Sequence, residues 1–247
     1  MKPGTAPFAA SLVDVYHSHW PSCQKTNMDE ALSKPKRVFM ILAAGFGWFA
    51  LVLQFYLLIT VALAKGTSFF VGVINYFSFF TILTNIIVAL ALSVPLLMPR
   101  FAVGRFFSRP MVQSGIAVCI VLVGIIYELL LRRLWNPEGM QFVADVILHN
   151  LMPLIYVLFW LIFVPKGRLR WKDPLLWLIY PVAYLLYALV RGAMTGLYPY
   201  PFIDVGQLGY GHVLVNAVAL MLAFLVLGLV FVGVDRAMGR AAWRVIG

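Results

Sequence analysis

The chain has 247 residues, of which 63% are hydrophobic and 11% are charged, and its mean hydropathy is +0.93. These values lie outside the range of water-soluble globular proteins. A net charge of +10 would suit a nucleic-acid-binding protein, but the basic residues cluster at the ends of apolar segments, as in membrane proteins. We therefore expect an integral membrane protein surrounded by membrane lipids, with no nucleic-acid partner.

The first 37 residues are polar and contain several prolines. They lack an apolar core of signal-peptide length, so we interpret residues 1–37 as a cytoplasmic tail and not as a cleaved leader. His17 and His19 are interpreted as solvated side chains, and no metal or other cofactor is expected. Cys23 lies in the tail and Cys119 in an apolar segment, so no disulfide bond between them is expected.

Six apolar stretches follow, each close to the length of about 20 helical residues that crosses a bilayer core of about 30 Å. They predict an all-α polytopic membrane protein, a six-helix transmembrane bundle within residues 38–236, followed by a short basic tail at 237–247. No internal repeat and no second domain are predicted. The predicted spans are residues 39–64, 69–98, 112–134, 142–164, 174–190 and 212–234.

The distribution of basic residues predicts the orientation. The chain has 19 Lys and Arg residues, and six crossings put most of them on the side of the two termini. Because cytoplasmic loops carry an excess of Lys and Arg, we expect both termini in the cytoplasm and the protein in the plasma membrane. The exceptions, expected on the outer side, are Lys65, Arg132, Arg133 and Arg191.

The second span carries an unusual set of polar residues. Ser78, Thr81 and Asn85 are three and four residues apart, so on a continuous helix they would form one polar stripe. Such residues commonly hydrogen-bond a backbone carbonyl or a neighbouring helix, and packing is one interpretation of each of them. A reactive site is the other.

Ionisable residues in the third and fourth spans are the other candidates, because such groups are costly in hydrocarbon and mark functional sites. Glu128 and His149 fall in the outer half of the bilayer, at a depth similar to that of Thr81. Asp145 precedes His149 by four residues and is placed to accept a proton from its ring. Pro153 follows His149 by four residues and removes a helical N–H, which predicts a kink and a polar notch.

Structural interpretations of these three residues remain open. Glu128 could form an interfacial ion pair with Arg132, four residues later. Asp145 could be hydrated at the outer end of the fourth span, and His149 could be a neutral imidazole held by a hydrogen bond.

Three short motifs together resemble the androgen-induced-gene family of membrane proteins, in its bacterial branch. They are FFTILTN (79–85), HNLMP (149–153) and GLYPYPFID (196–204). Animal members of that family are multi-span hydrolases of fatty acid esters of hydroxy fatty acids, with a threonine nucleophile and a histidine. The resemblance implies Thr81 as nucleophile, His149 as its base and a fatty-acyl ester as substrate. In this chain the His-to-Pro spacing is one residue shorter than in the animal pattern, and Asn85 is more polar than its counterpart.

A threonine hydroxyl needs a base within about 3 Å, and the oxyanion needs hydrogen-bond donors. Asn85, Ser78 or backbone groups near the proline kinks are the candidate donors, and Asp145 and Glu128 are candidate supporting residues. The substrate would enter from the outer leaflet. The expected mouth comprises Arg191, a carboxylate clamp or an interface anchor, with Tyr198, Tyr200 and Phe202 forming a rigid turn; Asp204 is expected to cap or pair nearby.

Two other functions compete with ester hydrolysis. A transporter, ligand sensor or assembly protein would use Glu128, Asp145 and His149 as a polar layer or proton relay. Alternatively, His149 and His212 could be axial ligands of a haem. The sequence does not predict the oligomeric state.

Overall fold

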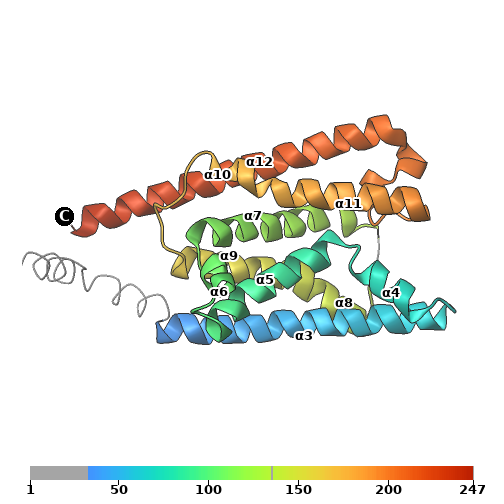
Figure 1. Cartoon of the computed structure of the whole chain (residues 1–247), viewed down its shortest axis with the longest axis horizontal. Coiled ribbons are helices and arrows are strands. Elements are labelled where there is room, and N and C mark those ends of the chain that lie inside the picture. The colour runs from blue at the N-terminus through green and yellow to red at the C-terminus, as the bar shows by residue number, and fades with distance from the viewer. Residues whose placement is uncertain (1–32, 135, 247) are drawn as a thin grey trace, which may run out of the picture. The chain divides into compact units, whose positions relative to one another are not determined.

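The computed structural model describes residues 33–134 and 136–246, with the backbone alone for 242–246. These residues are helical and contain no β-strand (Figure 1). Most of the predicted tail at 1–37, including His17, His19 and Cys23, lies outside the described residues. Residues 1–38 and the residues from Phe39 onward form separate units. The second of these units contains the candidate site.

Six helical segments in the described ranges are long and apolar enough to cross a membrane, which confirms the predicted all-α, six-span bundle. In the described ranges, two of these segments combine α-helix with π-helix, a third joins two α-helices, and three shorter helices lie between segments. In chain order, the helices are α3 (Lys34–Ala64), α4 (Phe69–Tyr76), α5 (Phe80–Leu97), α6 (Ala102–Phe107), α7 (Pro110–Ile126), the π-helix η1 (Tyr127–Leu131), α8 (Gly139–Val146), the π-helix η2 (Ile147–Leu151), α9 (Met152–Phe163), α10 (Asp173–Trp177), α11 (Ile179–Thr195), the 3₁₀-helix η3 (Pro201–Ile203) and α12 (Val205–Ile246).

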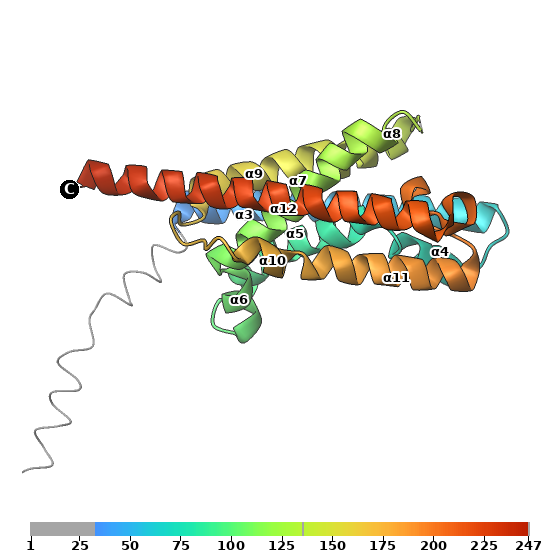
Figure 2. The same ribbon diagram turned by 90° about the horizontal axis from the view of Figure 1, so that it is seen from above.

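Helix α7 is the centre of the bundle, since it packs against α5, α9 and α12 (Figures 1 and 2). Its buried face includes Val118 and Ile120, which are almost inaccessible to solvent. Large apolar side chains on other helices point outward, and Phe70 and Leu97 are about three-quarters exposed, at 75% and 77%. An apolar outer surface of this kind is compatible with lipid as the surrounding solvent.

The second span was predicted as one helix over 69–98, but it is broken between α4 and α5. Phe79 has an extended backbone, with φ −91° and ψ 129°, and α5 begins at the next residue. Polar groups freed by the break are satisfied from elsewhere: the Tyr184 hydroxyl donates to the Ser78 carbonyl at 2.9 Å. Irregular backbone at membrane depth is tolerated where protein groups satisfy it in this way.

The segment between α11 and α12 folds back onto the bundle. Gly196 ends α11 with a positive φ of 71°, a conformation that favours glycine. The Tyr198 ring lies directly on Gly192, where an added Cβ would come within 2.0 Å of a ring carbon. Asp204 accepts the backbone N–H of Gln207 at 3.2 Å and so caps the start of α12, as the sequence suggested.

The helices extend past several predicted boundaries. The fifth span reaches Thr195, beyond the predicted end at 190, and α12 runs through the predicted C-terminal tail to Ile246. Composition marks the apolar part of a helix, whereas the backbone continues into the adjacent polar residues because Lys and Arg are good helix formers.

Candidate functional site

A cavity of about 500 Å³ lies among α3, α5, α8 and the GLYPYPF segment (196–202), within the size range of small-molecule sites. Most of its wall is apolar. Its polar lining residues come from five helices and from the GLYPYPF segment. They are Gln54, Thr81, Tyr127, Gln141, Asp145, His149 and Tyr200.

Asp145 and His149 form a hydrogen-bonded pair on this wall. The His149 Nδ1 atom is 3.2 Å from Asp145 Oδ1 and 3.1 Å from the Asp145 carbonyl oxygen. Both neighbours are acceptors, so the tautomer with its proton on Nδ1 fits these contacts, and that tautomer has a lone pair on Nε2. This is the arrangement that a general base requires.

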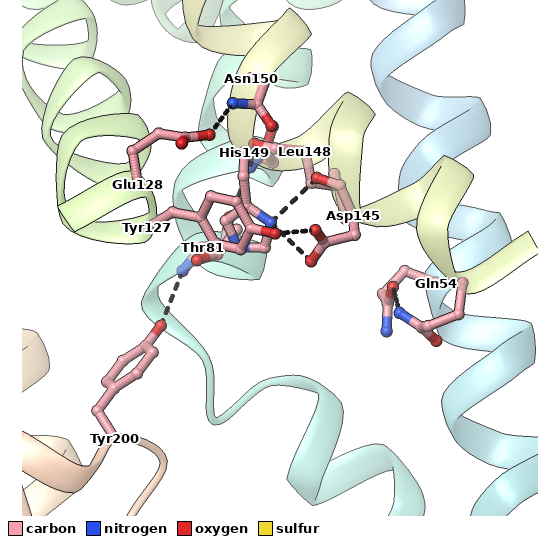
Figure 3. A network of polar contacts seen from close by, with 11 residues as sticks. Gln54, Thr81, Tyr127, Glu128, Asp145, Leu148, His149, Asn150 and Tyr200 are labelled. Atoms are coloured by element: carbon pink, nitrogen blue, oxygen red, sulfur yellow. Dashed lines mark hydrogen bonds and ion pairs between the residues drawn. The ribbon is translucent and has the colours of Figure 1, made fainter. Parts of the chain in front are cut away.

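Tyr127 completes the support of this pair, as Figure 3 shows. Its hydroxyl donates to Asp145 Oδ2, and its ring stacks on the His149 ring with centroids 4.0 Å apart and an angle of 15° between the planes. Asp145 is buried, with a relative exposure of 4%, and both of its carboxylate oxygens are engaged. Tyr127 therefore fixes the position of the carboxyl and the tilt of the imidazole.

The backbone around His149 is a π-helix. In η2 the N–H of Met152 bonds the carbonyl of Ile147, five residues earlier. In that register the next donor would be residue 153, which is proline and has no N–H, so the Leu148 carbonyl lacks a backbone partner. The expected disturbance before Pro153 thus takes the form of a π-bulge, a feature that occurs frequently at functional sites.

Asn85 supplies the missing donor. Its Nδ2 atom donates to the Leu148 carbonyl at 3.1 Å and to the Thr81 carbonyl at 2.9 Å. The side chain is fully buried and connects α5 to η2 beside the two candidate catalytic residues. Asn85 therefore serves as a connection between helices, the packing interpretation that the sequence left open.

Thr81 is the second residue of α5, so its N–H has no acceptor within the helix. This N–H donates to the Tyr200 hydroxyl at 3.4 Å, and Tyr200 approaches Thr81 from the side opposite Asp145 (Figure 3). Burial raises the pKa of Tyr200, so its hydroxyl stays protonated at neutral pH and remains a donor. The break in the second span thus places a helix N-terminus and a tyrosine hydroxyl beside Thr81.

Thr81 and His149 line the same cavity, but no hydrogen bond joins them in the part of the chain that the structure describes. Catalytic hydrogen bonds are commonly long or absent without substrate and tighten when it binds. Thr81 also lines a second, apolar cavity of about 70 Å³, and Leu131 and Tyr200 border both cavities. Thr81 is therefore located where the two cavities adjoin.

Ser78 and Glu128, two of the predicted supporting residues, do not line the larger cavity. Ser78 follows the end of α4, and its hydroxyl donates to the Ile74 carbonyl of that helix at 2.6 Å. The helix break separates Ser78 from the face of Thr81. Glu128 accepts from Arg132 at 2.6 Å and from Asn150 at 2.5 Å. Both thus make the structural contacts that the sequence offered as alternatives.

The residues of the predicted mouth separate into two groups. Tyr200 lines both cavities, and Phe202 stacks on Tyr200 with centroids 5.2 Å apart and lines the smaller cavity. Arg191 lines neither cavity: it donates to Asn75 Oδ1 at 2.6 Å and to the Leu197 carbonyl at 2.8 Å. Tyr198 packs on Gly192 and also lies outside both cavity walls.

Several cavity residues were missed by the sequence analysis. Tyr127 has no spacing signal that distinguishes it from an apolar packing residue. Gln141 precedes Asp145 by four residues, and this spacing could have identified it as part of the same helical face. Gln54 is a lone amide in the first span, and a buried or lipid-facing amide always requires a partner.

His212, the second residue of the haem hypothesis, is exposed on α12, and its Nδ1 atom lies 3.0 Å from the Leu208 carbonyl of the same helix. It does not line the cavity that contains His149. In the described ranges, no group of three or more His, Cys, Asp or Glu residues is arranged to hold a metal ion.

Comparisons of the chain with protein-family models, with curated proteins and with solved structures give no match.

Proposed function

We propose that the protein is an intramembrane hydrolase of fatty-acyl esters, with Thr81 as the nucleophile and His149 as the base. One observation carries this proposal: a threonine at a helix N-terminus and an Asp-supported histidine line one cavity of about 500 Å³. The resemblance of FFTILTN, HNLMP and GLYPYPFID to the androgen-induced-gene family points independently to the same two residues.

In the proposed reaction, His149 Nε2 accepts the proton of the Thr81 hydroxyl while Oγ1 attacks the acyl carbonyl carbon. The tetrahedral intermediate then expels the alkoxide, which takes the proton from Nε2 and leaves as an alcohol. Water next attacks the acyl-threonine carbonyl, with its proton going to His149. The bond between the acyl carbon and Oγ1 then breaks, Thr81 Oγ1 takes the proton back from His149, and the acid is released. Throughout, Asp145 stabilises the protonated imidazole through Nδ1.

The oxyanion would be stabilised at the start of α5. First-turn N–H groups of a helix point toward its N-terminus, and the helix dipole adds partial positive charge there. The Tyr200 hydroxyl is next to this end, since it accepts the Thr81 N–H. Tyr200 and the first turn of α5 therefore replace Ser78 and Asn85 as the candidate donors.

The substrate would reach the cavity from the outer leaflet of the plasma membrane, with both termini in the cytoplasm. The asymmetric distribution of Lys and Arg supports this orientation. This orientation is tested in intact cells with a thiol reagent that does not cross membranes, on single cysteines introduced at Lys65 and at Arg168 after Cys23 and Cys119 are replaced by serine. Labelling at position 168 and not at position 65 would show that the orientation is the opposite of the proposed one.

Ester hydrolysis is tested by labelling membranes with a fluorophosphonate probe, which reacts with activated hydroxyl nucleophiles. Labelling of the wild type should be lost in Thr81→Ala and in His149→Ala. Thr60→Ala is the matched control, because Thr60 is exposed on α3 and its hydroxyl bonds only the Leu57 carbonyl of its own helix. Labelling that persists in Thr81→Ala would exclude Thr81 as the nucleophile.

The competing proton-relay function predicts a continuous chain through Glu128, Asp145 and His149. Glu128 is bonded to Arg132 and Asn150 and lies outside the cavity wall, which does not favour this chain. A wild-type protein that no ester probe labels, and that carries protons across vesicle membranes, would support the relay instead.

A further inference from the structure

Besides the Asp145–His149 pair, the cavity has a second polar site, formed by the side-chain amides of two glutamines on different helices. Gln141 Nε2, on α8, donates to Gln54 Oε1, on α3, at 2.8 Å, and both residues line the cavity. In the described part of the chain, the amide N–H groups of Gln54 and the carbonyl of Gln141 make no other hydrogen bond. The pair therefore presents one donor and one acceptor, side by side, to whatever occupies the cavity.

The position of this pair relative to the reactive residues follows from helix geometry. Gln141, Asp145 and His149 are spaced four residues apart and share one face. Eight residues correspond to about 12 Å along a helix axis. Figure 3 shows Gln54 beyond Asp145 and away from Thr81. A ligand that reaches both places must carry a second polar group about 12 Å from the group beside His149.

The charges of the cavity wall restrict what that second group can be. No Lys or Arg of the described residues lines the cavity, and its acidic lining residue is Asp145. Arg132 and Arg191, two of the basic residues expected on the outer side, are engaged elsewhere, Arg132 with Glu128 and Arg191 with Asn75. A carboxylate in this cavity would lose water, find no cation and face an acid, which is unfavourable on all three counts.

We propose that the cavity selects uncharged esters that carry a second neutral oxygen function, a hydroxyl or an ester carbonyl, which the Gln54–Gln141 amide pair binds. That the ligand is an ester rests on the proposed function, whereas the preference for a neutral ligand does not. The animal relatives implied by the sequence resemblance act on esters with a free carboxylate. This chain would therefore differ from them in substrate class.

A purely structural role is the alternative for the amide pair, since such bonds commonly hold transmembrane helices together. Binding measurements separate the two roles. The probe is an analogue of a mid-chain acyloxy fatty acid in which an ether replaces the mid-chain ester bond. It is used as its methyl ester and as the free carboxylate, and recovery of intact methyl ester is checked after each measurement. At neutral pH, full-length protein in neutral detergent should bind the carboxylate at least about tenfold more weakly than the methyl ester. A tenfold difference corresponds to a change of one unit in the pKa of the ligand carboxyl between water and the cavity.

Variants of the pair test the assignment. Gln54→Lys supplies a cation and should abolish or reverse the preference for the methyl ester, while Gln141→Leu should weaken binding of the methyl ester. Gln207→Leu is the matched control, since Gln207 is an exposed glutamine on α12 that lines neither cavity and whose amide bonds Asp204. Equal binding of both probes by the wild type, or an unchanged preference in Gln54→Lys, would overturn the proposal.

The proposed function can fail separately. Hydrolysis of the corresponding true esters, with and without Thr81→Ala, reports on catalysis alone. If the wild type prefers the neutral ether but hydrolyses neither ester, the binding inference holds and the proposed hydrolase function is contradicted. If hydrolysis depends on Thr81 but both ethers bind equally well, the proposed hydrolase function holds and the inferred preference for neutral ligands is contradicted.

Discussion

Asn85 offers the sharpest test of how the site is held together. Its amide donates to the Thr81 and Leu148 carbonyls, at 2.9 and 3.1 Å, within a fully buried environment. Hydrogen bonds between transmembrane helices average about 0.6 kcal/mol and reach about 1.7 kcal/mol. Asn85→Leu removes both bonds at similar volume, so we expect a loss of about 1–3 kcal/mol in the free energy of unfolding.

The proline four residues after His149 allows a stricter version of this test. In the wild type, Pro153 has no N–H to offer to the Leu148 carbonyl. Pro153→Ala restores this N–H and so gives the carbonyl a possible backbone partner. In the Pro153→Ala background, Asn85→Leu should therefore cost less, by about 0.5–1.5 kcal/mol, the value of one hydrogen bond. The double-mutant cycle measures this coupling directly.

Reversible unfolding in mixed micelles, titrated with sodium dodecyl sulfate and followed by far-ultraviolet circular dichroism, provides the free energies. Thr60→Ala, whose hydroxyl bonds only its own helix, should show no coupling to Pro153→Ala. If Asn85→Leu costs the same in both backgrounds to within about 0.3 kcal/mol, the link between Asn85 and the proline is refuted.

Three further outcomes follow from the site. Gly45→Ala meets nothing within 4 Å and should stabilise the protein by about 0.5–1 kcal/mol in thermal unfolding, because Ala is the better helix former. Gly124→Ala should be less favourable than Gly45→Ala by about 1–3 kcal/mol, because its Cβ would lie 3.1 Å from the His149 carbonyl oxygen. Asp145→Asn should lower the rate of ester hydrolysis by about 10²–10⁴-fold without unfolding the protein, and an unchanged rate would remove Asp145 from the reaction. Tyr200→Phe should reduce the rate by about 10²–10³-fold with little change in binding of an ether analogue, and equal loss of rate and binding would assign Tyr200 to substrate binding alone.

Hydropathy was sufficient to predict the six spans, because it depends on local composition. Helical rise led to the expectation that Thr81 and His149 lie at a similar depth, and the two residues line one cavity. The Asp145–His149 contact also follows from a four-residue spacing on one helix. Those features need no knowledge of tertiary structure.

The features that were not predicted all depend on distant residues. The break after Phe77 has no Gly or Pro to mark it: it is satisfied by Tyr184 and Tyr200, which are more than 100 residues away in sequence. Ser78 was consequently assigned to a helical face that it does not share with Thr81. The contact of Tyr127 with Asp145 likewise joins two spans, and no periodicity within either span indicates it.

The π-helix η2 separates the fourth span into two halves whose faces are set independently. A π-bulge accommodates one residue more than an α-helix would over the same rise, and one residue corresponds to a rotation of about 100°. Deleting a single residue from 147–151 would turn Gln141 and Asp145 away from the cavity while α9 kept its packing. The chemistry of this chain is thus coupled to a one-residue insertion, and a relative of equal hydropathy without that insertion would present a different set of side chains to the same cavity.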